Sequence, residues 1–294
     1  MNQTLRLSII LPVDPPAVYR AITDASSLQK WVTEKARVSI SDGGFELWGR
    51  YLPGAPDRLA TELTEAIENR LLQFIWSYKT YTLPVTLELA SSNKGTVLTL
   101  TQEIPERSPG EASLADFWGL SFENLRRLLM NGSGPLFCDF STAHHEEAMV
   151  TAQINKPPKE VFTGLIEPQQ LERYLADKAT AEARVGGKID FGWEGDQGRA
   201  KGGSLGPIKI LELEPDHKLS YSWRFQEETV VTWVLEDSED GTRLTLVHSG
   251  FGKDRSTDDY TVGWFKFVNS LKSMVEIGES WQEAKVETVD GVVA

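Results

Sequence analysis

The sequence predicts an α+β protein built from two similar domains, and three observations support this. The second half of the 294-residue chain repeats the order of patterns found in the first half. The middle of each half consists of short segments with alternating apolar and polar residues, which is typical of antiparallel strands with one buried face. Each half then closes with a long amphipathic helix. A parallel, doubly wound fold would need a helix between successive strands, and the middle of each half contains none.

Each half opens with an alternating strand, predicted over residues 5–11 and 149–154. A pair of prolines follows each strand, Pro15-Pro16 in the first half and Pro157-Pro158 in the second. Because proline lacks the backbone N–H but suits the first helical turn, each pair ends a strand and starts a helix. A second short helix follows in each half, ending near Trp31 and Tyr174.

The strands after these helices correspond most closely between the halves. The run Leu72-Gln73-Phe74-Ile75-Trp76 matches Leu219-Ser220-Tyr221-Ser222-Trp223, and Gly95-Thr96-Val97-Leu98 matches Gly241-Thr242-Arg243-Leu244. Glycine pairs precede these strands as turn signals, at Gly43-Gly44 and Gly186-Gly187. We therefore expect an antiparallel meander of about six strands in each half.

The closing helix of the second half is predicted over residues 260–278, where large apolar residues recur every three or four positions. This spacing forms one apolar stripe, made by Trp264, Val268, Leu271 and Val275, with Phe267 and Met274 beside it. In the first half, the corresponding stripe consists of Trp118, Phe122, Leu125 and Leu129. Gly278 and Gly132 follow the two stripes, where glycine ends a helix in a left-handed turn. Helices this rich in aromatic residues need a concave apolar surface, which the preceding strands supply.

These elements predict a first domain over residues 1–132, a linker over 133–146, a second domain over 147–282 and a tail over 283–294. The linker follows the stretch Asn131-Gly132-Ser133-Gly134-Pro135, which is rich in helix-ending residues. The tail is polar and acidic, and we expect it to fray.

Composition excludes several classes of function. The net charge of −13 argues against nucleic-acid binding, which needs clustered Lys and Arg. The single cysteine, Cys138, rules out an internal disulfide and suits a reducing compartment. The N-terminus lacks the pattern of a secretory signal, and no stretch approaches the ~20 apolar residues of a membrane span. We expect a soluble cytoplasmic protein without integral membrane contact.

Strand periodicity identifies the side chains that face the interior, because alternate residues of a strand share one face. The apolar face of each meander carries one polar residue at an equivalent place, Gln102 in the first half and His248 in the second. The candidate ligand-binding residues are Phe74, Trp76, Gln102, Trp118, Phe191, Tyr221, Trp223, Trp233, His248 and Trp264. Gln102 and His248 either orient the polar end of a ligand or are core residues bonded to backbone or water. The aromatic residues serve as core first and as pocket lining second.

The sequence gives little support for catalysis, a metal or a cofactor. The run His144-His145-Glu146-Glu147 contains metal-ligand residue types, but it lies in the connection between halves and has no further ligand nearby. We interpret it as a solvated linker. Cys138 has no surrounding pattern of a nucleophile. Gly202-Gly203-Ser204-Leu205-Gly206 follows Lys201, yet it lacks the Gly-Lys-Ser/Thr ending of a phosphate loop and is interpreted as a turn.

The second half resembles the activator-of-heat-shock-protein-ATPase-like family, which belongs to the START-like superfamily, also called SRPBCC or helix-grip. The residues that carry this resemblance are Val161-Phe162, Leu171-Glu172-Arg173-Tyr174, Gly186-Gly187, Leu219 to Trp223, Gly241 to Phe251 and Gly263-Trp264. The first half is similar but weaker, with Thr101-Gln102-Glu103 in place of Val247-His248-Ser249. The resemblance implies two tandem helix-grip domains, in each of which a curved antiparallel sheet wraps around the long final helix and encloses a cavity.

The sequence leaves three hypotheses for function. The first is binding of a small hydrophobic or amphipathic molecule in a START-like cavity, with the second domain as the expected site. The second is a polyketide aromatase or cyclase, which would need several convergent proton-transferring groups. The third is a chaperone-ATPase stimulator, for which the acidic second half would dock on a basic partner. We expect a binding protein rather than an enzyme, without a cofactor.

Overall fold

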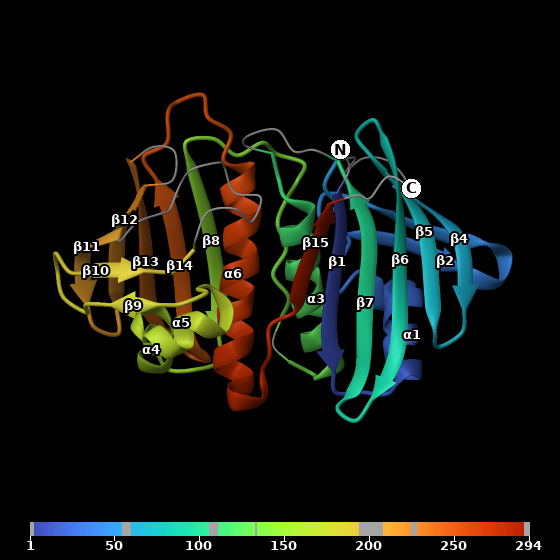
Figure 1. Cartoon of the computed structure of the whole chain (residues 1–294), viewed down its shortest axis with the longest axis horizontal. Helices are drawn as coiled ribbons and strands as arrows, with labels where there is room; N and C mark the ends of the chain where they lie inside the picture. The colour runs from blue at the N-terminus through green and yellow to red at the C-terminus, as the bar shows by residue number, and fades with distance from the viewer. Residues whose placement is uncertain are drawn as a thin grey trace. The chain divides into compact units, whose positions relative to one another are not determined.

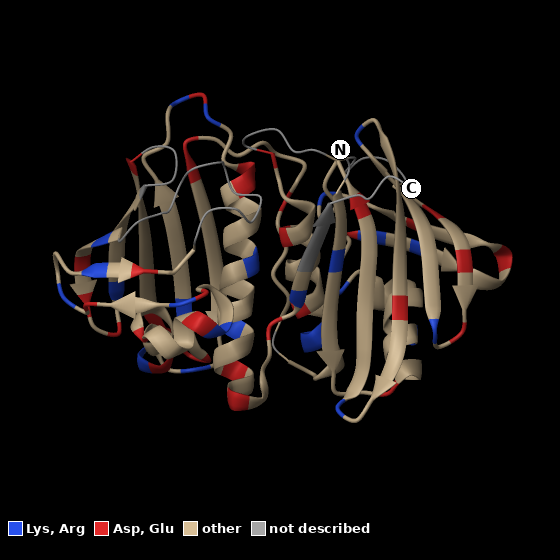
Figure 2. Ribbon diagram, viewed as in Figure 1, with Lys and Arg blue, Asp and Glu red and all other residues tan. Residues whose placement is uncertain are grey.

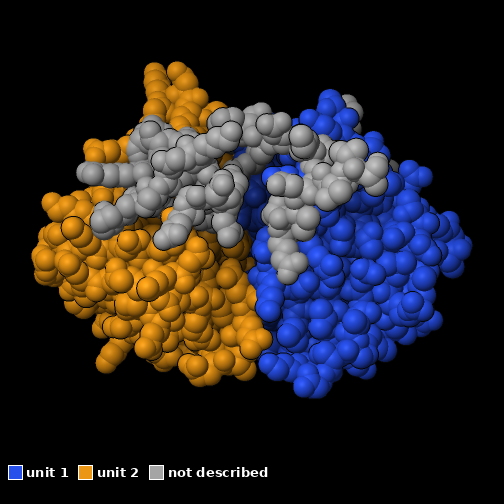
Figure 3. All heavy atoms as spheres, in the orientation of Figure 1, with its two compact units in different colours: residues 1–143, 284–294 blue, residues 144–283 orange. Residues whose placement is uncertain are grey.

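The computed structural model describes residues 3–54, 60–105, 111–132, 134–193, 208–224 and 228–290 (Figure 1). These residues form two compact units, which Figure 3 colours separately. Unit 1 comprises Met1–Ala143 with Ala284–Ala294, and unit 2 comprises His144–Glu283. The segment expected as a linker is therefore divided between the units after Ala143.

Unit 1 contains the elements in the predicted order. They are β1 (Gln3–Leu11), α1 (Pro15–Thr23), α2 (Ala25–Leu28), β2 (Lys35–Ser39), η1 (Ile40–Asp42), β3 (Gly44–Trp48), β4 (Thr61–Ile67), β5 (Leu71–Tyr78), β6 (Tyr81–Ser92), β7 (Gly95–Ile104) and α3 (Leu114–Leu129). Asp14 caps α1 by accepting a hydrogen bond from the backbone N–H of Ala17, and the proline pair occupies the first turn as predicted.

Unit 2 repeats this order. Its elements are β8 (Glu147–Ile154), α4 (Pro158–Ile166), α5 (Pro168–Tyr174), β9 (Thr180–Ala181), β10 (Lys188–Asp190), β11 (Ile208–Glu214), β12 (Lys218–Arg224), β13 (Glu228–Ser238), β14 (Gly241–Ser249), α6 (Asp258–Ile277) and η2 (Gly278–Ser280). The last strand of the chain, β15 (Lys285–Asp290), belongs to unit 1.

Both main sheets are antiparallel. The strand order is β15-β1-β7-β6-β5-β4 in unit 1 and β8-β14-β13-β12-β11-β10-β9 in unit 2, while β2 and β3 form a separate pair. Alternate residues of β1 are buried, among them Leu5, Leu7 and Ile9. Each sheet curves around the closing helix of its own unit, α3 or α6 (Figure 1). The predicted α+β architecture of two helix-grip domains is confirmed.

Two details of the closing segments differ from the prediction. The left-handed residue after α3 is Asn131, with φ 53°, rather than Gly132, whereas Gly278 does adopt positive φ after α6. Asparagine tolerates this region better than most residues because its short side chain makes local hydrogen bonds. Residues 285–290 of the segment that was expected to fray form β15, which pairs with β1 over Gln3 to Ser8. Period-two alternation in Lys285-Val286-Glu287-Thr288-Val289 was the available signal for this strand.

The first strand of each unit pairs on one side with the strand before the closing helix. On its other side, its backbone groups find hydrogen-bond partners in a different way in each unit. In unit 1, β15 supplies a hydrogen-bonding strand to β1. In unit 2, α6 covers β8 with side chains: Lys272 Nζ donates to the carbonyl of Gln153, and Glu276 Oε1 accepts from the backbone N–H of Asn155 at 2.8 Å. Both devices satisfy backbone groups that an open edge would leave unpaired.

Charged residues of both signs are interspersed over both units in the view of Figure 2. This distribution differs from the basic stripe that binding to a phosphate backbone requires. No helix among the described residues has both the length and the apolar character needed to cross a membrane.

Candidate functional site

The interior of unit 1 contains the predicted inward-facing residues. Phe74, Trp76, Gln102 and Trp118 are each at most 2% exposed. The rings of Trp76 and Trp118 lie edge to face with centroids 5.6 Å apart, a favourable arrangement for aromatic pairs. The burial predicted from strand periodicity is confirmed for this wall, while its role in ligand binding stays a prediction.

Gln102 is only half satisfied in this interior. Trp118 Nε1 donates to Gln102 Oε1 at 2.7 Å, which leaves the amide Nε2 of Gln102 as a donor. Neither Gln102 Nε2 nor Trp76 Nε1 has a hydrogen-bond partner among the described residues. A buried, unpaired N–H costs about 1–3 kcal/mol, so such groups are rare in folded proteins.

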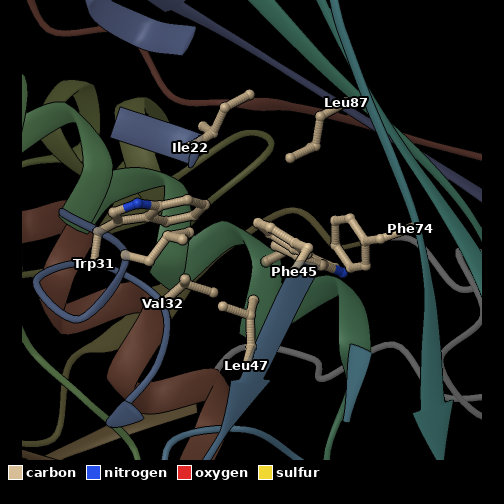
Figure 4. Close-up of a pocket in the computed structure, with 9 residues that line it drawn as sticks. Ile22, Trp31, Val32, Phe45, Leu47, Phe74 and Leu87 are labelled. Carbon is tan, nitrogen blue, oxygen red and sulfur yellow. The ribbon is translucent and has the colours of Figure 1, made fainter. Parts of the chain in front are cut away.

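Unit 1 contains a small apolar cavity (Figure 4), and Phe74 and Trp118 are among its lining residues. Its volume is about 10 Å³. It is lined by Ile22, Leu28, Trp31, Val32, Phe45, Leu47, Phe74, Leu87 and Trp118. A cavity of this size holds roughly one water molecule at most, and apolar cavities stay dry. The described interior of unit 1 around this cavity is therefore closely packed. The sequence had placed the expected binding site in the second domain, whereas this small cavity lies in the first.

In unit 2, His248 is fully hydrogen-bonded and fully buried. Trp264 Nε1 donates to His248 Nδ1 at 3.0 Å. The ring proton must then lie on Nε2, which donates to Thr229 Oγ1 at 2.8 Å. Thr229 Oγ1 in turn donates a hydrogen bond to the carbonyl of Trp223 at 3.3 Å. Burial, together with the positive charge of Arg255, lowers the pKa of His248 to about 3, so its imidazole is neutral near pH 7.

Aromatic residues surround this histidine. Trp223 lies 5.6 Å from the His248 ring and 5.3 Å from the Trp264 ring, measured between centroids. Phe191 contacts both Tyr221 and Trp223 at 6.2 Å. Trp233 Nε1 donates to Tyr221 Oη at 3.1 Å, and burial raises the pKa of Tyr221 above its ordinary value. The six residues predicted for the second domain are thus gathered in one buried cluster.

One donor of this cluster is unpaired. Trp223 is 5% exposed, and its indole N–H has no hydrogen-bond partner among the described residues. Trp223 and Trp76 occupy equivalent places in the two repeats, so the same unpaired N–H occurs twice in the chain.

Sequence reasoning did not identify Thr229 as a site residue. Thr229 stands opposite Trp223 in the β12–β13 pairing, and it is 2% exposed. Strand periodicity places it on the same face as Val231 and Trp233, which were assigned inward. A polar residue at an inward position next to a predicted inward histidine was the signal that could have revealed it.

We expect Thr229→Val to lower the free energy of unfolding of unit 2 by about 1–3 kcal/mol, because the Nε2–H of His248 would lose its acceptor in a buried place. Val keeps the shape of Thr, so the change isolates the hydroxyl. The measurement is urea denaturation followed by hydrogen exchange of unit 2 peptides. Thr232→Val is the matched control, since its hydroxyl lies on the opposite face of the same strand beside Ser220. Equal losses in the two variants would contradict the assigned His248 network.

The other candidate groups do not gather into a catalytic or metal site. His144 is half-buried, and its Nδ1 lies 2.8 Å from Asp258 Oδ1 at the start of α6, whereas His145, Glu146 and Glu147 are exposed. Burial opposes ionisation of Asp258, but the hydrogen bonds from His144 and Ser256 lower its pKa below the ordinary value. Among the described residues, no three His, Cys, Asp or Glu side chains are placed to hold a metal ion. Cys138 is buried, and Gly202 to Gly206 lie outside the described residues.

Two fused domains, each with a curved antiparallel sheet around its closing helix, define a tandem helix-grip protein of the START-like superfamily. The sequence profile of the family described as "Activator of Hsp90 ATPase homolog 1-like protein" matches residues 12–130 and again residues 155–276. The chain therefore belongs to this family and carries two copies of its domain.

Several solved structures are similar to this chain. The crystal structure of protein MLL2253 from Mesorhizobium loti is 27% identical with a TM-score of 0.40, and the match covers 45% of this chain and 98% of that one. The solution structure of the Aha1 dimer from Colwellia psychrerythraea is 20% identical with a TM-score of 0.38, over 46% and 98% of the chains. DynU16, a protein of the dynemicin biosynthetic locus, is 18% identical with a TM-score of 0.34, over 93% and 98%. No curated protein matches the chain.

Proposed function

We propose that this protein binds a small, mainly apolar molecule with a hydrogen-bond acceptor in its helix-grip interior. One observation carries the proposal: the indole N–H groups of Trp76 and Trp223 are both buried and unpaired among the described residues, at equivalent places in the two repeats. A ligand oxygen that accepts from either indole would recover the hydrogen bond that folding leaves unmade. The surrounding aromatic rings would cover the apolar part of the ligand.

Binding in unit 1 would require its lining to move, because the cavity of about 10 Å³ is too small for an organic molecule. Phe45 and Leu47 line one side of it from β3 (Figure 4). This strand forms ladder pairs with β2 in a separate two-stranded sheet. Three hydrogen bonds join it to the start of β4: Ala60 N–H donates to the Leu47 carbonyl, Leu47 N–H donates to Thr61 Oγ1, and Thr61 Oγ1 donates to the Phe45 carbonyl. The β2–β3 hairpin is the wall whose displacement would disturb the fewest sheet hydrogen bonds.

Ligand screening by native mass spectrometry, followed by calorimetry, tests the proposal. The panel contains aromatic ketones, fatty acids and hydrocarbons of matched size. We expect saturable binding of at least one acceptor-bearing compound, and at least a tenfold loss of affinity in Trp76→Phe or Trp223→Phe, which corresponds to about 1.4 kcal/mol for one hydrogen bond.

Trp233→Phe is the control for this experiment, because the N–H that it removes is already bonded to Tyr221. We expect this variant to lose stability while a bound ligand keeps its acceptor contact. If no compound in the panel binds at sub-millimolar concentration, or if all three variants weaken binding equally, the proposal fails.

No observation in the described residues favours the aromatase or cyclase hypothesis. Both ring nitrogens of His248 are engaged in hydrogen bonds, and its pKa of about 3 keeps it neutral. A general acid or base works best with a pKa near the operating pH. Stimulation of a chaperone ATPase stays a prediction, and an ATPase assay at low and moderate salt tests it.

A further inference from the structure

The two interiors differ at one pair of equivalent positions, Leu83 in unit 1 and Thr229 in unit 2. Leu83 stands opposite Trp76 in the β5–β6 pairing, and Thr229 stands opposite Trp223 in the β12–β13 pairing. Both side chains are buried, at 3% and 2% exposure. The two residues therefore occupy the same place on the inner face of each sheet.

The chemistry at this place decides whether the neighbouring polar residue is satisfied. In unit 2, Thr229 Oγ1 accepts from His248 Nε2 at 2.8 Å. The alkyl group of Leu83 has no acceptor to offer, and Gln102 Nε2 in unit 1 has no partner among the described residues. Gln102 holds the position of His248, since each stands opposite a valine, Val85 or Val231, in the same register.

Unit 1 consequently offers two unpaired donors, Gln102 Nε2 and Trp76 Nε1, whereas the corresponding places in unit 2 offer only Trp223 Nε1. The two donors of unit 1 belong to the same patch of the inner face. Val85 pairs with both Phe74 and Gln102, and Trp76 lies two residues from Phe74 along β5. Trp118 contacts both residues, through its ring with Trp76 and through its N–H with Gln102.

We infer that unit 1 is a carbonyl-selective site for an uncharged apolar ligand, and that the residue at position 83 or 229 sets this selectivity. A carbonyl oxygen has two lone pairs and can accept from both N–H groups. Both donors are neutral, and Trp118, which contacts both of their residues, lines a cavity with apolar walls. A carboxylate would lose its hydration there without a compensating cation, which disfavours an ionised ligand. This inference rests on the proposed function and adds the ligand class and the selecting residue.

The first test needs no ligand and compares Leu83→Thr with Leu83→Val. These variants have the same shape and differ only in a hydroxyl, which in an apolar core lowers stability. In Leu83→Thr we expect the new hydroxyl to accept a hydrogen bond from Gln102 Nε2, as Thr229 Oγ1 accepts one from His248 Nε2. We expect Leu83→Thr to melt at the same temperature as Leu83→Val or higher. A clearly lower melting temperature for Leu83→Thr would show that Gln102 Nε2 is not directed at this position and would overturn the inference.

The second test uses two probes of the same shape, acetophenone and α-methylstyrene, which differ in carrying a carbonyl or a methylidene group. Binding is followed through the indole N–H signals in ¹⁵N NMR spectra, with Trp76 and Trp223 identified from their Phe variants. We expect Leu83→Val to prefer acetophenone by about a hundredfold, tenfold for each of its two donors, with a downfield shift of the Trp76 signal. In Leu83→Thr the new hydroxyl engages Gln102 Nε2 and leaves Trp76 Nε1 as the remaining donor, so the preference should fall to about tenfold.

Leu87→Ala repeats the measurement in an enlarged cavity, because Leu87 lines it. If neither probe binds wild type or Leu87→Ala, both this inference and the proposed function fail for unit 1. If the two probes bind equally, or if Leu83→Thr and Leu83→Val show the same preference, the proposed function survives and the selectivity inference is overturned.

Discussion

Replacement of Gly241 by alanine is expected to lower the free energy of unfolding of unit 2 by at least about 3 kcal/mol, and Gly95→Ala is expected to do the same in unit 1. Gly241 has φ +125° and Gly95 has φ +118°, a region that residues with a side chain rarely adopt. A Cβ at Gly241 would lie 2.4 Å from the carbonyl oxygen of Ile154, and one at Gly95 would lie 2.2 Å from that of Leu11. Because the opposing atoms are backbone, the clash cannot be relieved by a rotamer change.

The position of these glycines explains why the loss would be large. Each begins the strand, β14 or β7, that pairs with the first strand of its unit, β8 or β1. The next residue in each case, Thr242 or Thr96, donates its hydroxyl to a backbone carbonyl just beyond that first strand. A shift of the glycine would therefore disturb both the sheet register and this connection.

Urea denaturation of each variant, resolved by hydrogen exchange of peptides from the two units, measures the effect. Gly43→Asn is the control, because Gly43 also has positive φ, +75°, but no atom lies within 4 Å of the added Cβ. We expect this control to lose less than about 1 kcal/mol, since asparagine tolerates the left-handed region. Similar losses for Gly43→Asn and Gly95→Ala would contradict the steric argument.

The backbone architecture was predictable from the sequence because it depends on periodicity and turn chemistry. Period-two alternation in Leu219 to Trp223 identified both the strand and its buried face. The three- and four-residue spacing of Trp264, Val268 and Leu271 identified the closing helix. The repeat supplied a second copy of each pattern, which made the order of elements clear even where the first half was weaker.

The hydrogen bonding of the interior could not be predicted in this way. Periodicity places His248 and Gln102 inward, but it does not say which atoms they meet. Their different environments depend on a cross-strand neighbour, Thr229 or Leu83, that lies far from each of them in sequence. The path of the tail was missed for a related reason, because the partner of β15 is the first strand of the chain.

Acidification between about pH 6.5 and pH 4.5 is expected to destabilise unit 2 through His248. Burial and the charge of Arg255 lower its folded-state pKa to about 3, while an unfolded histidine has a pKa of about 6.5. Below pH 6.5 the unfolded state therefore takes up a proton that the folded state does not bind. The stability contributed by neutral His248 is fully present above pH 6.5 and is lost progressively as the pH falls towards 3.

The expected slope approaches about 1.4 kcal/mol for each pH unit once the unfolded histidine is protonated, so the loss by pH 4.5 is about 2–3 kcal/mol. The hydrogen bonds of His248 also disfavour its protonation in the folded state. Nδ1 accepts from Trp264 Nε1 and Nε2 already donates to Thr229, so a protonated Nδ1 would face the Trp264 donor as a second donor. The measurement is urea denaturation of the full chain at intervals of half a pH unit, with unit 2 resolved by hydrogen exchange.

His248→Gln isolates this contribution, because glutamine already accepts from the equivalent tryptophan in unit 1, where Trp118 donates to Gln102. We expect the variant to be less stable than wild type at pH 8 and to have a flatter profile between pH 6.5 and 4.5. Asp258 does not affect this comparison. Because the pKa of its carboxylate is lowered, the stability that Asp258 contributes is present above about pH 4 and is lost only below that pH. Parallel profiles for wild type and His248→Gln across this range would mean that His248 does not remain neutral in the folded interior.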